Sequence, residues 1–273
     1  MNVTDTVTYF SHPETAIHSC AFYGHTEIAK FLIDKGLNDS AVDWFDRGAL
    51  HSLVLGINPK DEMMTLLVEA GADVNAPWGW NTPLQMAATT TRHDRMVQQL
   101  LDLGANQNAA DWKGLRPVHK AATRPNAARD RCLLEAGKNA EIADHDGRTP
   151  LHEAARCGMT ENVKVLLEMG ANPSSVDSAG STPLQYALDD FGDEASMHRI
   201  LHLGASMLDQ SRETYTDCIL PCQLEQTNPM AVEMLLAAGA DIAKLDRYGN
   251  GPLGWAVARA RGADYPRARL PGR

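Results

Sequence analysis

Apolar residues recur along the chain at helical spacing, in short segments separated by glycine and proline. The clearest pair of predicted helices lies within residues 149–170, where Thr149 and Pro150 open the first helix and Gly170 closes the second. The apolar positions are Leu151, Ala154 and Ala155 in the first helix and Val163, Leu166 and Leu167 in the second. One such pair cannot bury its own apolar face, so the pattern predicts copies of itself on both sides.

Two independent markers show that these copies run along the chain. The residue at the Leu151 position recurs at steps of 33 to 35 residues, as Ile17, Leu50, Leu84, Val118, Leu151, Leu184, Ile219 and Leu253. The glycine that closes the second helix recurs with it, as Gly36, Gly71, Gly104, Gly137, Gly170, Gly204 and Gly239. A period kept throughout predicts one elongated stack rather than separate domains.

The segment Thr149-Pro150-Leu151-His152-Glu153-Ala154 resembles the signature of the ankyrin repeat, and partial matches occur near Ile17, Leu84, Val118 and Leu184. The resemblance implies an all-α solenoid of helix-turn-helix repeats with protruding hairpin or loop fingers. We expect about seven full repeats and a C-terminal capping half-repeat within residues 1–262. Residues 263–273 are predicted to be a disordered basic tail.

Charge and hydropathy narrow the possible partners. The chain has 35 acidic and 25 basic residues and a net charge of -10, which disfavours nucleic acid as a partner. No run approaches the length of a membrane-spanning helix, and residues 1–10 lack the basic start and apolar core of a secretion signal. We therefore expect a cytoplasmic monomer, able to reach the nucleus by diffusion, with no membrane partner.

Aromatic residues gather in the loops that precede the repeat marker. The resemblance implies that the residue six positions before the marker lies at a finger tip, free of packing contacts. Consecutive repeats carry tryptophan at this position, with two more aromatic residues nearby: Trp44, Trp78 and Trp112, with Phe45 and Trp80. Because neighbouring units of packed helices are about 10 Å apart, we expect the rings to line one wall of a concave groove.

Other side chains are predicted to face the same groove. They are Phe22, Tyr23, Arg47, Arg124, His145 and Arg156. An exposed apolar patch of this kind usually marks a binding site, and tryptophan is enriched at interface hot spots. The alternative is that the rings lie flat on neighbouring fingers and only stabilise the stack.

Two further expectations concern polar residues. The resemblance implies that His18, His51, His119 and His152 hydrogen-bond neighbouring fingers rather than act in chemistry. In the fourth repeat, Arg124, Arg129 and Arg131 predict a locally basic, irregular edge.

Three functions fit the groove, and the sequence leaves them open. The favoured one is a protein-interaction module with tryptophan anchors and arginines at the rim. The groove could instead bind an apolar small molecule. It could also be a cofactor-independent enzyme of cyclase or isomerase type, with His145 and Asp146 as acid and base and Arg148 stabilising negative charge. We expect no cofactor and no metal, since His198 and His202 lack a third ligand.

Overall fold

The structure is a computed structural model that describes residues 16–36, 42–43, 46–90, 95–137, 139–189, 234–252 and 254. The chain divides into two compact units, the first formed by residues 1–121 with 132–138 and the second by 122–131 with 139–273. The single solenoid expected over residues 1–262 stays a prediction. The tail at 263–273, the markers Ile219 and Leu253, and the His198 and His202 pair lie outside the described residues.

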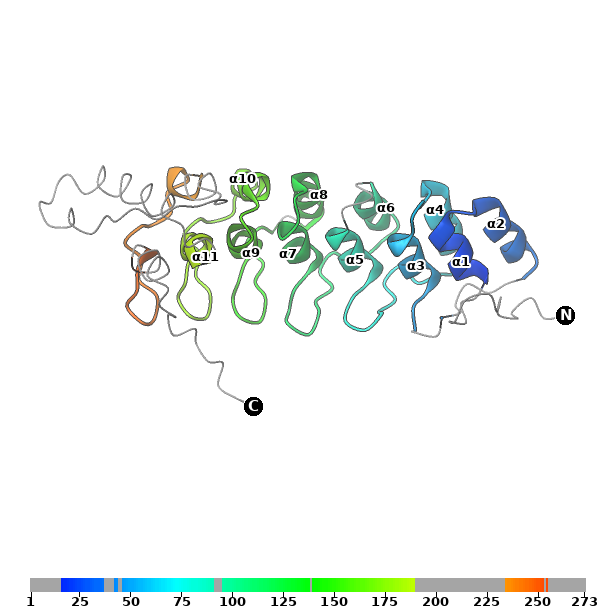
Figure 1. Ribbon diagram of the computed structural model, residues 1–273, viewed down its shortest axis with the longest axis horizontal. Coiled ribbons are helices and arrows are strands. Elements are labelled where there is room, and N and C mark those ends of the chain that lie inside the picture. The colour runs from blue at the N-terminus through cyan, green and yellow to red at the C-terminus, as the bar shows by residue number, and fades with distance from the viewer. Residues whose placement is uncertain are drawn as a thin grey trace, which may run out of the picture. The chain divides into compact units, whose positions relative to one another are not determined.

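The first unit contains two layers of short helices (Figure 1). In one layer α1 (Ala16–Tyr23), α3 (Ala49–Leu55) and α5 (Pro83–Thr89) pack side by side. In the other, α2 (Thr26–Asp34), α4 (Asp61–Glu69) and α6 (Met96–Asp102) do the same. Each helix of one layer also packs on its successor in the other, as helix-turn-helix repeats require. The marker residues Ile17, Leu50 and Leu84 are fully or almost fully buried between the layers.

The helices that follow continue the pattern. Residues of both units occur in α7 (Pro117–Ala122) and in α8 (Ala127–Gly137). The second unit contains α9 (Pro150–Arg156), which packs against α10 (Thr160–Glu168) and α11 (Pro183–Asp189). Among the described residues the only β-pairing consists of two isolated bridges, so the predicted all-α ankyrin architecture is confirmed there.

Local capping explains why the first helix of a repeat begins where it does. The Thr82 hydroxyl accepts a hydrogen bond from the backbone N–H of Gln85, and the Gln85 side chain accepts one from the N–H of Thr82. His152 takes the place of this glutamine in α9, and its Nδ1 accepts from the N–H of Thr149 at 3.1 Å. Both helices therefore start with a reciprocal cap that satisfies otherwise unpaired N–H groups.

The same motif residue reaches forward to the loop of the next repeat. His18 Nε2 donates to the carbonyl of Arg47 at 2.7 Å, and His152 Nε2 donates to the carbonyl of Ser181 at 3.1 Å. Gln85 Nε2 does the same with the carbonyl of Leu115, at 3.1 Å. The bridging role that the resemblance implied for the motif histidines is confirmed for His18 and His152, and Gln85 makes the same contact without having been predicted to. Burial lowers the pKa of His152, so its imidazole is neutral in this role.

The predicted basic edge of the fourth repeat is wrong in part. Arg129 is only 1% exposed, inside a regular helix α8. Arg131 forms an ion pair with Glu168 at 2.7 Å. Arg124 remains exposed, so one of the three arginines contributes positive charge to this edge.

Candidate interaction site

Most loops between repeats are built around a buried aspartate. Asp144 Oδ1 accepts backbone hydrogen bonds from Asp146 at 2.9 Å and from Arg148 at 2.8 Å. The aspartates at 111, 177 and 246 organise their own loops through the residues two and four positions ahead. The carboxylate thus fixes the loop backbone and leaves the residue that follows it free to point outward.

The loop at residues 76–81, which we call the third loop, is built differently because Pro77 occupies the aspartate position. Trp78 and Asn81 exchange backbone hydrogen bonds of 2.8 and 3.1 Å as an antiparallel bridge. Gly79 and Trp80 form the tight turn between them, with Gly79 at a φ of 57°. Trp80 therefore lies at the tip of this loop, which the sequence had assigned to Trp78.

Trp78 is half-buried and packs against residues of the preceding repeat. The Arg47 guanidinium lies over the indole, 5.6 Å from the ring centroid. His51 approaches the indole edge to face, with centroids 6.1 Å apart. This tryptophan stabilises the loop, as the stacking alternative expected.

Trp80 and Trp112 are the exposed tryptophans of the first unit's described loops, with exposed fractions of 65% and 58%. Trp112 lies in the loop at residues 110–115, the fourth loop, and the Lys113 ammonium sits 4.8 Å from its ring centroid. We call the surface formed by Trp80 and Trp112 the tryptophan face. Two large apolar side chains on consecutive loops are costly to leave in water.

A lysine ties these two loops together. Lys120 Nζ lies 2.7 Å from Asn81 Oδ1 and 2.8 Å from Asp111 Oδ2. Burial raises the pKa of Asp111, but hydrogen bonds from Lys120 and the backbone outweigh it and leave the pKa below its usual value. Because Asn81 follows Trp80 and Asp111 precedes Trp112, this contact fixes the positions of both tryptophan-bearing loops.

The other predicted groove residues of the first unit occupy varied positions. Phe22 and Tyr23 end α1 and contact each other edge to face at 5.1 Å, and Tyr23 is 40% exposed. Arg47 is committed to Asp43 through an ion pair of 2.6 Å, so it is not a free cation at a rim. Trp44 and Phe45 lie outside the described residues.

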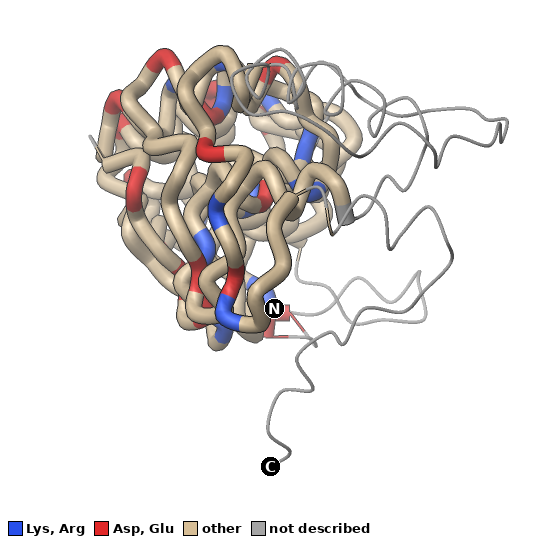
Figure 2. Tube along the Cα trace, turned by 90° about the vertical axis from the view of Figure 1, so that its left-hand side faces the viewer, with Lys and Arg blue, Asp and Glu red and all other residues tan. Residues whose placement is uncertain are grey.

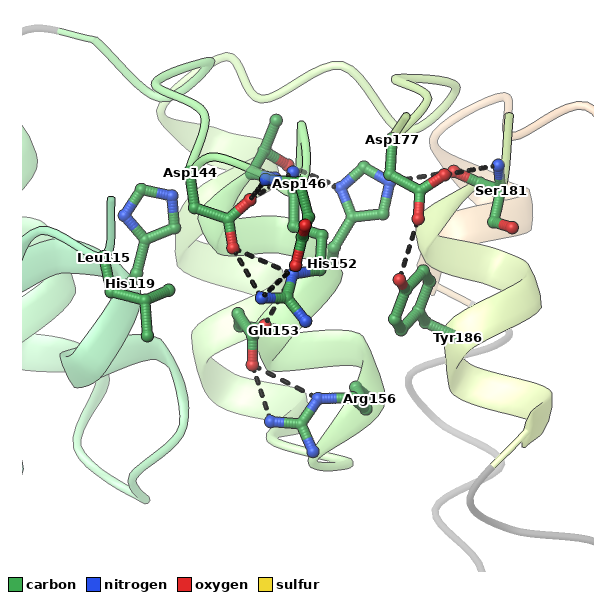
Figure 3. A network of polar contacts seen from close by, with 12 residues as sticks. Leu115, His119, Asp144, Asp146, His152, Glu153, Arg156, Asp177, Ser181 and Tyr186 are labelled. Atoms are coloured by element: carbon green, nitrogen blue, oxygen red, sulfur yellow. Dashed lines mark hydrogen bonds and ion pairs between the residues drawn. The ribbon is translucent and has the colours of Figure 1, made fainter. Parts of the chain in front are cut away.

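The predicted acid and base group lies in the second unit (Figure 3). Arg148 pairs with Asp144 at 2.7 Å, with Asp146 at 3.2 Å and with Glu153 at 3.5 Å. These three carboxylates leave Arg148 no freedom to stabilise charge on a substrate. Arg156, which is labelled in Figure 3, forms an ion pair with Glu153 at 2.6 Å.

His145 is exposed, and no hydrogen bond joins its side chain to another described residue. The backbone carbonyl of Asp146 accepts hydrogen bonds from the N–H and hydroxyl of Ser178, a structural link between loops. A general base needs a group that orients it, and His145 has none among the described residues. The acid and base hypothesis therefore gains no support from this geometry.

Sequence reasoning missed a buried polar network next to this group. The Tyr186 hydroxyl donates to Asp177 Oδ2 at 2.8 Å, and the Tyr186 ring meets His152 edge to face at 5.4 Å. Burial, reinforced by Asp177, raises the pKa of Tyr186 above its usual range. The aspartate at the head of most loops, Asp177 here, was the available signal, because its spacing from the marker is constant. The network holds the loop before α11 against α9 (Figure 3).

Two kinds of site are absent from the described residues. Within those ranges no three histidine, cysteine or carboxylate side chains come together as a possible metal site. None of the helices described has the length and apolar character needed to cross a bilayer.

Paired helices at a constant period, joined by aspartate-centred loops, define a helical repeat protein of the ankyrin class. The family model described as ankyrin repeats in three copies matches residues 1–77 and 127–211, and that of the single ankyrin repeat matches 80–112. These matches cover more than half of the chain, which belongs to the ankyrin repeat family.

Several curated proteins are similar over part of the chain. Ankyrin repeat and SOCS box protein 6 of Mus musculus is 36% identical over 104 residues, which are 36% of this chain and 24% of that protein. Transient receptor potential cation channel subfamily A member 1 of Homo sapiens is 30% identical over 108 residues, 40% of this chain and 10% of that protein. The similarity thus spans a quarter or less of either relative. Ankyrin repeats generally mediate protein–protein interaction.

Proposed function

We propose that this chain binds a partner protein and that Trp80 and Trp112 are its central contact residues. The observation that carries the proposal is the exposure of two indole rings on consecutive loops, 65% and 58%, in a family of binding modules. Exposure of an indole ring to water is unfavourable, so covering it with a partner contributes favourable free energy to binding.

The support around these rings favours binding over mere exposure. Within the third loop Trp78 packs against Arg47 and His51, and Lys120 ties the third loop to the fourth. Loops that are ordered before binding lose less conformational entropy when a partner arrives. Truncation of a tryptophan at such a hot spot typically costs about 2 kcal/mol or more of binding free energy.

The test uses the Trp80→Ala, Trp112→Ala double variant as bait in quantitative affinity capture from cell extract. We expect one or more proteins captured by the wild-type chain to be depleted at least tenfold with the double variant. Phe31→Ala is the matched control, because Phe31 is 59% exposed on α2 rather than on either loop. Equal capture by wild type and double variant, or equal loss with Phe31→Ala, would contradict the proposal.

A further inference from the structure

One packing position of the repeat is exposed in α2 and buried in the helices that follow it. The position eight residues before the closing glycine is apolar in the outer layer of the first unit: Ile28 in α2, Met63 in α4 and Met96 in α6. Met63 and Met96 are 0% and 3% exposed, because α4 packs on α2 and α6 packs on α4. Ile28 is 52% exposed, and among the described residues no helix precedes its repeat. Ile28 therefore occupies a packing position that nothing in the described chain covers.

Phe31 enlarges this apolar surface. It lies one helical turn beyond Ile28 on the same side of α2 and is 59% exposed, whereas Leu66 at the equivalent place in α4 is half-buried. In Figure 1, α2 is the outermost labelled helix at the blue end of its layer. We call Ile28 and Phe31, with the flanking Glu27 and Lys35, the α2 edge. Because the equivalent residues of α4 and α6 pack against a helix, a helix is the occupant that this edge fits.

The charged residues of the α2 edge are arranged symmetrically about Phe31. Glu27 lies four residues before it and Lys35 four residues after it, so the three side chains share one side of the helix. Both charged residues are exposed, and the Lys35 ammonium lies over the Phe31 ring, 5.5 Å from its centroid. In an antiparallel pair of α2 helices centred on Phe31, each Glu27 faces the Lys35 of the other copy. The α2 edge is therefore complementary to itself.

The overall charge of α2 also favours an occupant of the same kind. Its exposed acidic residues, Glu27 and Asp34, are balanced by the exposed Lys30 and Lys35. Acidic and basic residues are likewise interspersed along the described trace (Figure 2). A helix of mixed charge complements this surface, whereas a strongly acidic or strongly basic helix meets like charges as well as opposite ones.

We propose that the α2 edge binds the α2 edge of a second copy of this chain, in a symmetric dimer whose α2 helices pack antiparallel. Ile28 and Phe31 of both copies form its apolar centre, and Glu27 of each copy pairs with the Lys35 of the other. A two-fold interface of this kind requires a self-complementary surface and is the commonest in homo-oligomers. The inference goes beyond the proposed function, because it concerns a different face from the tryptophan face. It also replaces the monomer that the sequence led us to expect.

Sedimentation equilibrium of the full chain measures this association. The weight-average mass should rise from the monomer value of 29.7 kDa toward twice that value between about 1 and 200 μM, because a small interface gives a weak dimer. Phe31→Glu should weaken the dimer about tenfold or more, since it places two carboxylates at the centre of the interface. The Trp80→Ala, Trp112→Ala double variant should dimerise as the wild type does. The two proposals can therefore fail independently.

Charge reversal tests the antiparallel arrangement. Glu27→Lys and Lys35→Glu should each weaken self-association about fivefold or more, because the two-fold axis repeats each like-charge contact. An equimolar mixture of these two variants should dimerise again, since both contacts then join opposite charges. Glu62→Lys is the matched control, because Glu62 is exposed at the equivalent position of α4. It should leave the mass curve unchanged.

Several outcomes would overturn the inference. They include a chain that stays monomeric throughout, a dimer insensitive to Phe31→Glu, and variants whose mixture associates no better than either alone. A monomer whose Phe31 resists oxidative labelling would show that another segment of the same chain covers the α2 edge. A monomer that loses capture of a different protein on Phe31→Glu would assign the edge to a foreign helix.

Discussion

At the scale of single residues, Asp130 is the side chain that departs most from its equivalents. It is fully buried in α8, in the register position that other repeats fill with buried apolar residues, namely Ala29, Met64, Val97 and Val163. Burial raises the pKa of Asp130 well above its usual value, and the Asn162 amide and the Arg129 charge offset this only in part. The repeat register could have flagged this position from the sequence.

Replacement of this carboxyl should change how stability depends on pH. Folding raises the pKa of Asp130. The stability that its protonated carboxyl contributes is therefore fully present below the unfolded pKa of about 3.9 and is lost as the pH rises through the folded pKa. We expect Asp130→Asn to stabilise the chain relative to wild type, by an amount that grows between pH 5 and pH 8 in urea unfolding. The exposed Asp34 provides the control, as Asp34→Asn. A wild-type minus variant difference that does not change with pH would refute this account.

At the scale of elements, the motif residue three positions after the helix-capping threonine joins two repeats, those of Gln85 and His152, to the repeats that follow them. His152 and Gln85 make equivalent contacts, one to a repeat's own N-cap and one to the following loop. Both side chains are uncharged. The positions of their polar atoms must therefore explain why either residue can occupy this place in the repeat. Both place one acceptor and one donor at the required separation.

Exchange of His152 tests this equivalence. His152→Gln should retain most of the stability, whereas His152→Leu should lose about 1 to 3 kcal/mol. The leucine leaves the buried Thr149 N–H without its partner and removes one of the two hydrogen bonds that the Ser181 carbonyl accepts. The measurement is the free energy of unfolding in urea at pH 7. Equal stability of the glutamine and leucine variants would show that packing, not hydrogen bonding, explains the motif.

Close approach of backbones tests the packing of the first repeat on the second. A Cβ added at Gly24, where φ is 75°, would lie 2.1 Å from the carbonyl oxygen of Asn58. At Gly36, with a φ of 86°, nothing lies within 4 Å of the added atom. Gly36→Ala should cost about 1 kcal/mol from backbone strain alone, and Gly24→Ala clearly more. Similar urea midpoints for the two variants would mean that the close contact between Gly24 and the Asn58 carbonyl does not constrain the packing of these two repeats.

The sequence predicted the helices well and the tryptophan face only in part. Marker residues such as Leu84 and closing glycines such as Gly36 follow from a period that burial enforces at every repeat. The third loop could not be predicted in the same way. Pro77 removes the carboxylate that shapes other loops, and the resulting turn exchanges the positions of Trp78 and Trp80. Arg129 was misread because its charge suggested exposure, whereas its place in the helix register determines burial.

At the scale of the whole chain, the family is established and the partner is a proposal. The net charge of -10 comes from an excess of acidic residues, whereas beside the tryptophan face Lys120 is paired with Asp111 and the Lys113 ammonium lies over the Trp112 ring. Affinity at that face should therefore depend on covered apolar area more than on ionic strength. The matched region is a quarter or less of the relatives reported, so their names do not identify the partner.

Oxidative footprinting of aromatic side chains, read by mass spectrometry with and without the captured partner, tests the central claim most directly. In the free chain we expect Trp80 and Trp112 to be modified faster than the half-buried Trp78. Bound partner should protect Trp80 and Trp112 several-fold and leave Phe31 unchanged. Modification of both tryptophans at the same rate in the free and bound chain would contradict their role as the contact residues.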